Sequence, residues 1–542
     1  MSESKRPSSV SSSSKPHTSD ASAVPEIELA TGQVVTGLEI APLRRQFSIF
    51  SIIAVGYNIS NSWVAIATSF SIAIQSGGAP SLLYGIIAVT VAMVGTGITL
   101  AELASVYPTA GGQYHFTSIL ASQRWSRGLS YFSGLAAVFA WITLAASIAL
   151  AATQALMAIV IRWQPGYVSA PWHYFLVYQL FNALMVAYNV FLTGKTLWVY
   201  NAGFILSIVT FIVITVTCPA SAHTTIDSHA VWTHLVNGSN GWPDGVSFLT
   251  GLSTPQFMLS GLDATLHLAE EALQPERIVP RAVMVTVLIG FLTAFPFSIS
   301  AIYSFKDVSA SLESPTGFPV YFIWEKATSS PAAATVFMTA TCIITCVALN
   351  AVHQTTSRLT WSLARDEALL FSSHLSKISP TLRVPVYALV VDGVFVLLLG
   401  IVYVASTNAF NAFIACTVIV AQISFAVPAA LLLWRRRDPH YLPPNRAFWV
   451  PGWVGCASNV MTIVWAVVIT VFFCFPAAFP VKGGNMSGFI LSFFRSFLRS
   501  FLPSFLPSFL PSFLPALFSS FFPSFSCCAY SKWIFILFRG SC

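Results

Sequence analysis

Residues 251–265 read GLSTPQFMLSGLDAT and residues 54–63 read AVGYNISNSW, and both stretches interrupt long apolar runs. They concentrate small, polar and helix-breaking residues where a membrane helix is normally apolar. The residues concerned are Gly56, Asn58, Ser60, Asn61 and Ser62 in the earlier stretch, and Gly251, Ser253, Pro255, Ser260, Gly261 and Asp263 in the later one. Unwound backbone is tolerated in a membrane only where it lines a cavity or is buried in protein. The alternative explanation is close helix packing through small residues.

The composition of the whole chain is that of a membrane protein. Hydrophobic residues make up 55% of the 542 positions and charged residues only 8%, and the mean hydropathy is +0.73. Soluble domains carry about 25% charged residues, so this chain has too few charges to cover a water-facing surface. The net charge of +7 is explained by basic residues on the cytoplasmic side of a membrane, and we expect no nucleic-acid partner.

Eleven runs are long enough for a spanning helix, which needs about 20 mostly apolar residues. Their approximate bounds are 47–71, 80–104, 129–156, 172–193, 197–218, 246–268, 281–304, 332–353, 385–405, 409–434 and 455–476. The two interrupted stretches fall in the first and the sixth run, which would begin two five-helix halves. Matching interruptions in two halves are the best sequence indication of a transporter's midplane binding site.

Basic residues mark one side of the predicted membrane protein. With the N-terminus inside, the cytoplasmic segments hold Arg44, Arg45, Arg124, Arg127, Lys195, Arg277, Arg281, Arg358, Arg365, Lys377, Arg383, Arg435, Arg436, Arg437 and Arg446. The outer loops between the helices hold only Arg162, Lys306 and Lys326. This asymmetry predicts a cytoplasmic N-terminus.

Three further strings carry a resemblance to a known family. They are AELASVYPTAGGQYHF (101–116), GLDATLHLAEEALQP (261–275) and TSRLTWSLARDEALLFS (356–372). Together they resemble the amino acid–polyamine–organocation superfamily, most closely its fungal branch of amino acid, GABA and choline permeases, over about residues 40–480. The resemblance implies an all-α membrane protein with a LeuT-like fold, in which two inverted five-helix repeats have broken first helices. It also implies proton-coupled uptake of an amino acid or related amine, and no cofactor other than the proton.

The predicted domain organisation follows from the runs and the resemblance. Residues 1–42 are polar and serine-rich without the apolar segment of a signal peptide, so they are predicted to be a disordered cytoplasmic tail. Residues 43–486 are predicted to be the transporter domain. Its repeats span about 43–218 and 246–434, and an eleventh helix follows near 455–476. We expect the protein in the plasma membrane, and its oligomeric state stays open.

The resemblance assigns binding roles to particular residues. The broken first helix, with Gly56, Asn58, Ser60 and Asn61, would present backbone amides to a substrate carboxylate, because a helix N-terminus suits an anion. The broken sixth helix, with Ser260, Gly261 and Asp263, would face the substrate amine. The aromatic side chains of the third span, Phe139 and Trp141, are candidates for the pocket wall.

Asp263 is the first candidate for a functional carboxylate. A carboxylate near the centre of a membrane helix costs about 2.5–3.5 kcal/mol on insertion scales, so it normally faces a cavity and has a partner. Asp263 could pair with a cationic amine or carry a proton. The alternative is that it caps the unwound segment by accepting backbone N–H bonds, as Asp does at helix starts.

A gate of ion pairs is predicted at the cytoplasmic helix ends. It would consist of Glu102, Glu270 and Glu271 with Arg358 and Arg365; the alternative is solvated interface charge worth about 0–1 kcal/mol per pair. Two histidines, His267 and His353, are interpreted as packed interface residues rather than proton carriers. Asp392, within the ninth run, receives no role.

Other classes of function are not favoured by the sequence. The chain has no GxSxG, HExxH or phosphate-binding glycine loop, so we predict no enzyme. Cys342 and Cys346 lie one helical turn apart, but without further ligands they are interpreted as buried thiols rather than a metal site. The remaining alternatives are a nutrient sensor that binds the solute with little flux, and a channel, against which the paired broken helices argue.

The segment 487–542 departs from the family where a twelfth helix is expected. Proline recurs every four residues, at Pro503, Pro507, Pro511 and Pro515, and each proline removes a helical hydrogen bond. A TTCC repeat in DNA reads as Phe-Leu-Pro-Ser in every frame, which explains the period. We therefore interpret this segment as a translated tetranucleotide repeat, arising from a faulty gene model or a genuine frame change.

Overall fold

The structure is a computed structural model, and it describes residues 47–475 except positions 165, 223–225, 239–240 and 307. The predicted N-terminal tail (1–42), Arg44, Arg45 and the repeat segment (487–542) lie outside the described residues.

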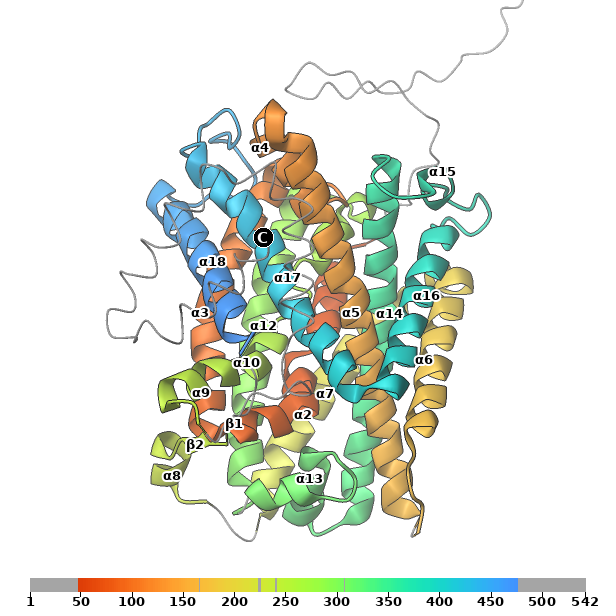
Figure 1. Ribbon diagram of the computed structural model, residues 1–542, viewed down its shortest axis with the longest axis vertical. Helices are drawn as coiled ribbons and strands as arrows, with labels where there is room; N and C mark the ends of the chain where they lie inside the picture. The colour runs from red at the N-terminus through yellow and green to blue at the C-terminus, as the bar shows by residue number, and fades with distance from the viewer. Residues whose placement is uncertain (1–46, 165, 223–225, 239–240, 307, 476–542) are drawn as a thin grey trace, which may run out of the picture. The chain divides into compact units, whose positions relative to one another are not determined.

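Regular structure in the described residues is almost entirely helical (Figure 1). The helices are α1 (Ile49–Ser60), α2 (Ser62–Gln75), α3 (Gly78–Val106), α4 (Gln113–Leu120), α5 (Gln123–Trp163), α6 (Pro171–Phe191), α7 (Trp198–Ser221), α8 (Ser228–Thr233), α9 (Asp244–Gly251), α10 (Ser253–Phe257), α11 (Ala264–His267), α12 (Pro275–Tyr303), α13 (Pro319–Thr328), α14 (Pro331–Arg365), α15 (Ser372–Leu375), α16 (Val386–Ala405), α17 (Thr407–Trp434) and α18 (Gly452–Phe472). The 3-10 turns are η1 (Thr193–Lys195), η2 (Ala269–Glu271) and η3 (Val308–Glu313), and the strands β1 (Ser76–Gly77) and β2 (Val236–Asn237) pair antiparallel.

The predicted spans are confirmed as helices of an integral membrane protein. Within the described part of the chain, ten helical segments are long and apolar enough to cross a membrane, with α1 and α2 together forming one of them. The predicted sixth span is present as the short helices α9, α10 and α11. Outward-facing leucines at positions 176, 180 and 184 form a stripe on α6, each about half exposed. Such a stripe of apolar side chains at helical spacing suits contact with lipid.

Both predicted interruptions are present in the backbone. The first helix breaks at Asn61, which separates α1 from α2 and has a left-handed conformation (φ 32°). The sixth span is open between the end of α10 at Phe257 and the start of α11 at Ala264, and Gly261 within this gap has φ +75°. Residues rarely adopt positive φ unless they are glycine or asparagine, and these two residue types stand at the two breaks.

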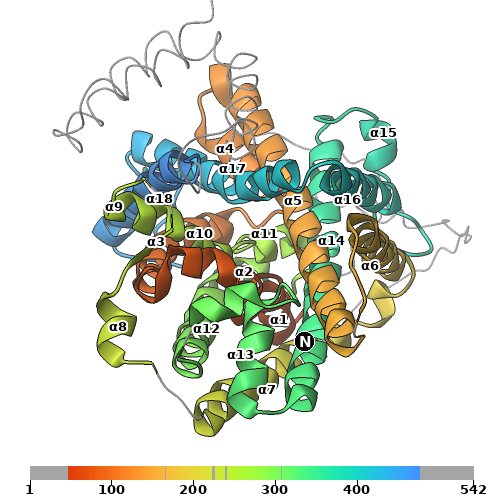
Figure 2. The same ribbon diagram turned by 60° about the horizontal axis from the view of Figure 1, so that its bottom comes forward.

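Spans of the first half pack on their counterparts in the second half. Helix α1 packs on α11, α3 on α12, α5 on α14 and α6 on α16. Figure 2 shows the last two of these pairs side by side. Because each half contributes five crossings, a span and its counterpart five crossings later run in opposite directions through the membrane. This arrangement agrees with two repeats of inverted orientation.

Loops on alternate sides of the predicted membrane lie at opposite ends of the helices. Figure 1 shows α4 and α15 at one end, and α8, α13 and the β1–β2 pair at the other. We call the end with α4 and α15 the basic end, because the arginine-bearing connections 435–451 and 366–385 also lie there.

Candidate functional site

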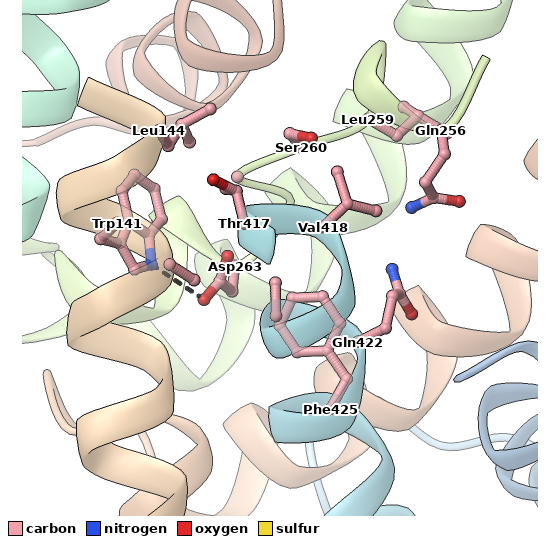
Figure 3. Close-up of a pocket in the computed structure, with 13 residues that line it drawn as sticks. Trp141, Leu144, Gln256, Leu259, Ser260, Asp263, Thr417, Val418, Gln422 and Phe425 are labelled. Carbon is pink, nitrogen blue, oxygen red and sulfur yellow. Dashed lines mark hydrogen bonds between the residues drawn. The ribbon is translucent and has the colours of Figure 1, made fainter. Parts of the chain in front are cut away.

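A cavity lies between the broken sixth span, α5 and α17 (Figure 3). It contains about 350 Å³ of space between atoms, but only a small part of this is wide enough for a water molecule. The cavity is lined by Ala140, Trp141, Leu144, Gln256, Leu259, Ser260, Gly261, Asp263, Thr417, Val418, Ala421, Gln422 and Phe425. A solute larger than water therefore requires these elements to separate.

Asp263 is the charged residue of this cavity, and three side chains bind one of its oxygens. Its Oδ2 accepts hydrogen bonds from Gln113 Nε2 at 2.6 Å and Trp141 Nε1 at 3.2 Å, and it lies 3.0 Å from His267 Nε2. Only 4% of Asp263 is exposed. Its side chain makes no capping bond to the backbone of α11, so the capping alternative is wrong in this structure.

The second oxygen of Asp263 is free to meet a ligand. Among the described residues no donor binds Oδ1, and Figure 3 shows this oxygen turned away from Trp141, toward the Thr417 side of the cavity. The aromatic rings of Trp141 and Phe425 stand on either side. A buried carboxylate oxygen with aromatic neighbours suits a small cation, because both the charge and the ring faces attract it.

The predicted binding residues divide into two groups. Ser260, Gly261, Asp263 and Trp141 line the cavity, whereas Phe139 is not among its lining residues. Gly261 also has a steric role, since a Cβ there would lie 2.6 Å from Ile59 Cγ2.

The predicted residues of the first span do not line the cavity. Gly56, Asn58, Ser60 and Asn61 are buried, and the side chains of the last three make internal hydrogen bonds. Asn58 Nδ2 donates to the Tyr200 carbonyl at 2.7 Å, and Asn61 Oδ1 accepts from Ser207 at 3.0 Å. Both partners lie on α7, so these two side chains are held by α7. The role predicted for the backbone amides of this span stays a prediction.

Sequence reasoning missed the contribution of α17 and of Gln113. The α17 residues Val418, Ala421, Gln422 and Phe425 recur at helical spacing and form one face of the cavity. A polar Gln422 within an apolar run was the available signal. Gln113 lay within a string that carried the family resemblance, but its contact with Asp263 depends on how α4 folds back.

Two of the predicted gate pairs are present at the basic end. Arg358 Nε donates to Glu271 Oε1 at 2.8 Å, and both side chains are only 3% exposed. Arg365 holds Glu270 through two bonds of 3.1 Å, and this pair is partly exposed. Both pairs join η2, which follows the broken sixth span, to α14.

The predicted place of Glu102 in this gate is wrong. Its buried carboxylate is bound by Arg437 at 2.6 Å and Arg446 at 2.5 Å instead of Arg358 or Arg365. The reason is that α3 packs on α18, and the connection leading into α18 supplies these two arginines. Glu102 therefore anchors the 435–451 connection.

Comparisons with known proteins agree with the geometry. A family model described as "Amino acid permease" matches residues 47–495. The choline transporter of Saccharomyces cerevisiae is 33% identical over 453 residues, which cover 82% of this chain and 78% of that protein. A swainsonine transporter of Arthroderma benhamiae is 31% identical over 442 residues, covering 80% of this chain and 85% of that protein. A Macrophomina phaseolina protein named as an amino acid/polyamine transporter is 26% identical over 440 residues, covering 80% of this chain and 96% of that protein. These names describe transporters rather than enzymes.

Proposed function

This chain belongs to the amino acid permease family, and from that premise we propose that it takes up a small solute with a cationic nitrogen by proton symport. The main support for this proposal is the Asp263 carboxylate, which is buried at the broken sixth span with Oδ1 directed into the cavity. Choline and polyamines, which appear in the names of two relatives, both carry a cationic nitrogen. In this proposal Asp263 Oδ1 is the counter-ion of the solute, and Trp141 and Phe425 contact its substituents.

The narrow cavity supports transport by alternating access. At the basic end, Arg358–Glu271 and Arg365–Glu270 tie η2, which follows the sixth span, to α14. A solute that leaves toward this end requires these pairs to part. We place the basic end in the cytoplasm of a plasma-membrane protein, because basic loops stay on the cytoplasmic side. The N-terminus would then be cytoplasmic.

The proposal is tested by uptake of labelled choline, ethanolamine, GABA and amino acids in a permease-deficient yeast host. We expect saturable, concentrative uptake of a cationic solute that is faster at acidic than at neutral external pH. The variant Asp263→Asn removes the negative charge and should reduce uptake about 10- to 100-fold at unchanged surface expression. A sensor without flux or a channel would not concentrate the solute.

The matched control is Asp392→Asn. Asp392 on α16 is also buried, at 1% exposure, but it does not line the cavity, and its Oδ1 accepts a bond from Thr360. This control should retain uptake. Equal loss in both variants, or full uptake by Asp263→Asn, would contradict the role of Asp263 as counter-ion.

A further inference from the structure

His267 lies in a hydrogen-bonding position that a neutral histidine cannot satisfy beside an ionised Asp263. It is completely buried on α11, and each ring nitrogen has one partner. Nδ1 lies 2.8 Å from the carbonyl oxygen of Ala110. A carbonyl only accepts hydrogen bonds, so Nδ1 must carry a hydrogen.

The second ring nitrogen therefore requires another proton. Nε2 lies 3.0 Å from Asp263 Oδ2, and a neutral ring protonated at Nδ1 would turn a lone pair toward this oxygen. Oδ2 also accepts N–H bonds from Gln113 and Trp141, and such bonds favour an ionised carboxylate. The proton consequently lies on Nε2, and the pair consists of imidazolium and carboxylate.

We propose that His267 and Asp263 form a one-proton site whose proton holds the linker 107–112 against the sixth span and thereby controls the gate. This inference rests on the proposed function, and it assigns the proton coupling of that function to a site. It replaces our interpretation of His267 as a packed interface residue. A neutral His267 can donate either to Ala110 or to Asp263, so loss of the proton releases one of the two.

The linker connects this proton to the gate through a single residue. Ala110 accepts from His267 with its carbonyl, and its N–H donates to Glu270 Oε1 at 3.2 Å. Glu270 in turn pairs with Arg365 of α14. Directly after the linker, Gln113 at the start of α4 donates to Asp263. Both the proton site and the gate therefore hold the same short segment in place.

Other ionisable groups on the elements around α11 do not bind the pair. They include Tyr57 of α1, Tyr107 of the linker, Tyr114 and His115 of α4, Glu270 and Glu271 of η2, Glu276, Arg277, Arg281 and Tyr303 of α12, and Cys342, Cys346, His353, Arg358 and Arg365 of α14. Among the described residues, none of them makes a hydrogen bond to His267 or Asp263. Burial lowers the pKa of the His115 imidazole, which disfavours a proton there. Tyr114 binds Ser362 and Asp366 instead.

The same carboxylate links the proton to the solute. A cation at Asp263 Oδ1 would neutralise the charge that holds the proton at Nε2, because opposite charges favour each other's ionised forms. Solute binding then weakens the bonds that hold the proton and the linker, while both solute and proton stay bound until the cytoplasmic gate opens. Proton and solute would leave through the gate that the linker no longer holds.

The first test needs no solute and uses hydrogen–deuterium exchange of the full chain in lipid nanodiscs. After correction for intrinsic rates, peptides covering residues 107–113 should be protected at acidic pH and lose protection as the pH is raised, because loss of the proton releases one of the two bonds of His267. In His267→Gln, which binds no such proton, the protection should not depend on pH. Protection independent of pH in the unmodified chain would overturn the proposal.

The second test separates coupling from transport in proteoliposomes, with labelled choline as the probe and the membrane potential clamped at zero. With a pH difference of about one unit, coupling to one proton supports at most about tenfold accumulation. We expect the unmodified chain to approach this ratio. His267→Gln should exchange choline by counterflow but accumulate none. Accumulation by His267→Gln equal to that of the unmodified chain would overturn the proposal.

Controls and a second measurement keep the outcomes distinct. His353→Gln changes a fully buried histidine whose ring nitrogens have no partner among the described residues, and it should still accumulate choline. His115→Gln should do the same. If His267→Gln shows no counterflow, the second measurement is proton uptake when choline is added to proteoliposomes of the unmodified chain. Choline flux without proton movement would contradict the proposed proton site. An unmodified chain that exchanges no choline, GABA, ethanolamine or amino acid would contradict the proposed function itself.

Discussion

At the residue scale, Gly261 keeps the cavity open because it has no side chain. Its φ of +75° is a backbone conformation that disfavours residues with a side chain. In addition, a Cβ would lie 2.6 Å from Ile59 Cγ2 and 3.3 Å from Trp141 Cη2. We expect Gly261→Ala to lower the free energy of unfolding by at least about 1–2 kcal/mol through its backbone conformation alone, and to reduce solute uptake. Thermal unfolding in detergent and uptake measure the two effects.

The matched control for this substitution is Gly128→Ala. Gly128 lies in α5, and a Cβ there meets nothing within 4 Å. Alanine in a helix interior is favoured over glycine by about 0.5–1 kcal/mol, so this variant should be as stable as the unmodified chain or more stable. Similar destabilisation by both variants would contradict the steric role of Gly261.

The buried pair Glu271–Arg358 should behave differently from the more exposed pair Arg162–Glu325. Removing one partner of a buried pair leaves an uncompensated charge and costs about 3–5 kcal/mol, whereas an exposed pair contributes about 0–1 kcal/mol. We expect Arg358→Met to unfold at a markedly lower temperature, and Glu271→Gln in the same chain to restore part of the loss. Arg162→Met, whose pair is 34% and 22% exposed, should change little. A double-mutant cycle without coupling between residues 271 and 358 would contradict this expectation.

At the element scale, the sequence predicted where helices cross the membrane better than where they end. The run 332–353 became α14, which continues to Arg365. Its last turns contain Gln354, Thr355 and Ser357, which are completely buried against protein. Hydropathy measures affinity for lipid. A span predicted from it therefore ends where the helix begins to pack polar side chains against protein. The two breaks were predictable because asparagine and glycine, which stand there, adopt the positive φ that interrupts a helix more readily than other residues.

The facing of each helix could not be predicted in the same way. The run 409–434 was predicted as a span, but which of its side chains turn toward Asp263 depends on the packing of α17 against α5 and α18. For the same reason Glu102 was assigned to the wrong arginines. The break was expected around Gly56 to Ser62 and lies at Asn61, whereas Gly56 to Ser60 are helical, and the side chains of Asn58 and Asn61 bind α7.

The ion pairs of Glu102 with Arg437 and Arg446 should hold α18 in place. Two arginines of the 435–451 connection share this one buried carboxylate, and Arg437 is 11% and Arg446 7% exposed at the side chain. Glu102→Gln leaves both charges without a counter-ion, which costs several kcal/mol in a buried site. We expect faster proteolysis within 435–451 and a lower unfolding temperature. Glu325→Gln at the exposed pair is the control, and equal proteolysis of both variants would contradict this anchoring role.

At the scale of the whole molecule, the halves contribute unequally to the site. The cavity takes its lining from α5 of the first half and from the sixth span and α17 of the second. The proton pair lies on the sixth span, but the residues that respond to it, Ala110 and Gln113, follow the second span. Relative movement of the two halves therefore changes the cavity, the proton pair and the gate together.

The repeat segment 487–542 should be dispensable for this machinery. The lining residues of the cavity fall between Ala140 and Phe425, and the ion pairs of the basic end fall between Glu102 and Arg446. We expect a chain that ends at residue 486 to exchange choline by counterflow like the full chain. A chain that ends before Gly452 lacks α18, which packs on α3 and α17, and should fail. If the shorter deletion gives a monodisperse protein without counterflow, residues beyond 486 take part in transport, because the described site would then be intact and still inactive.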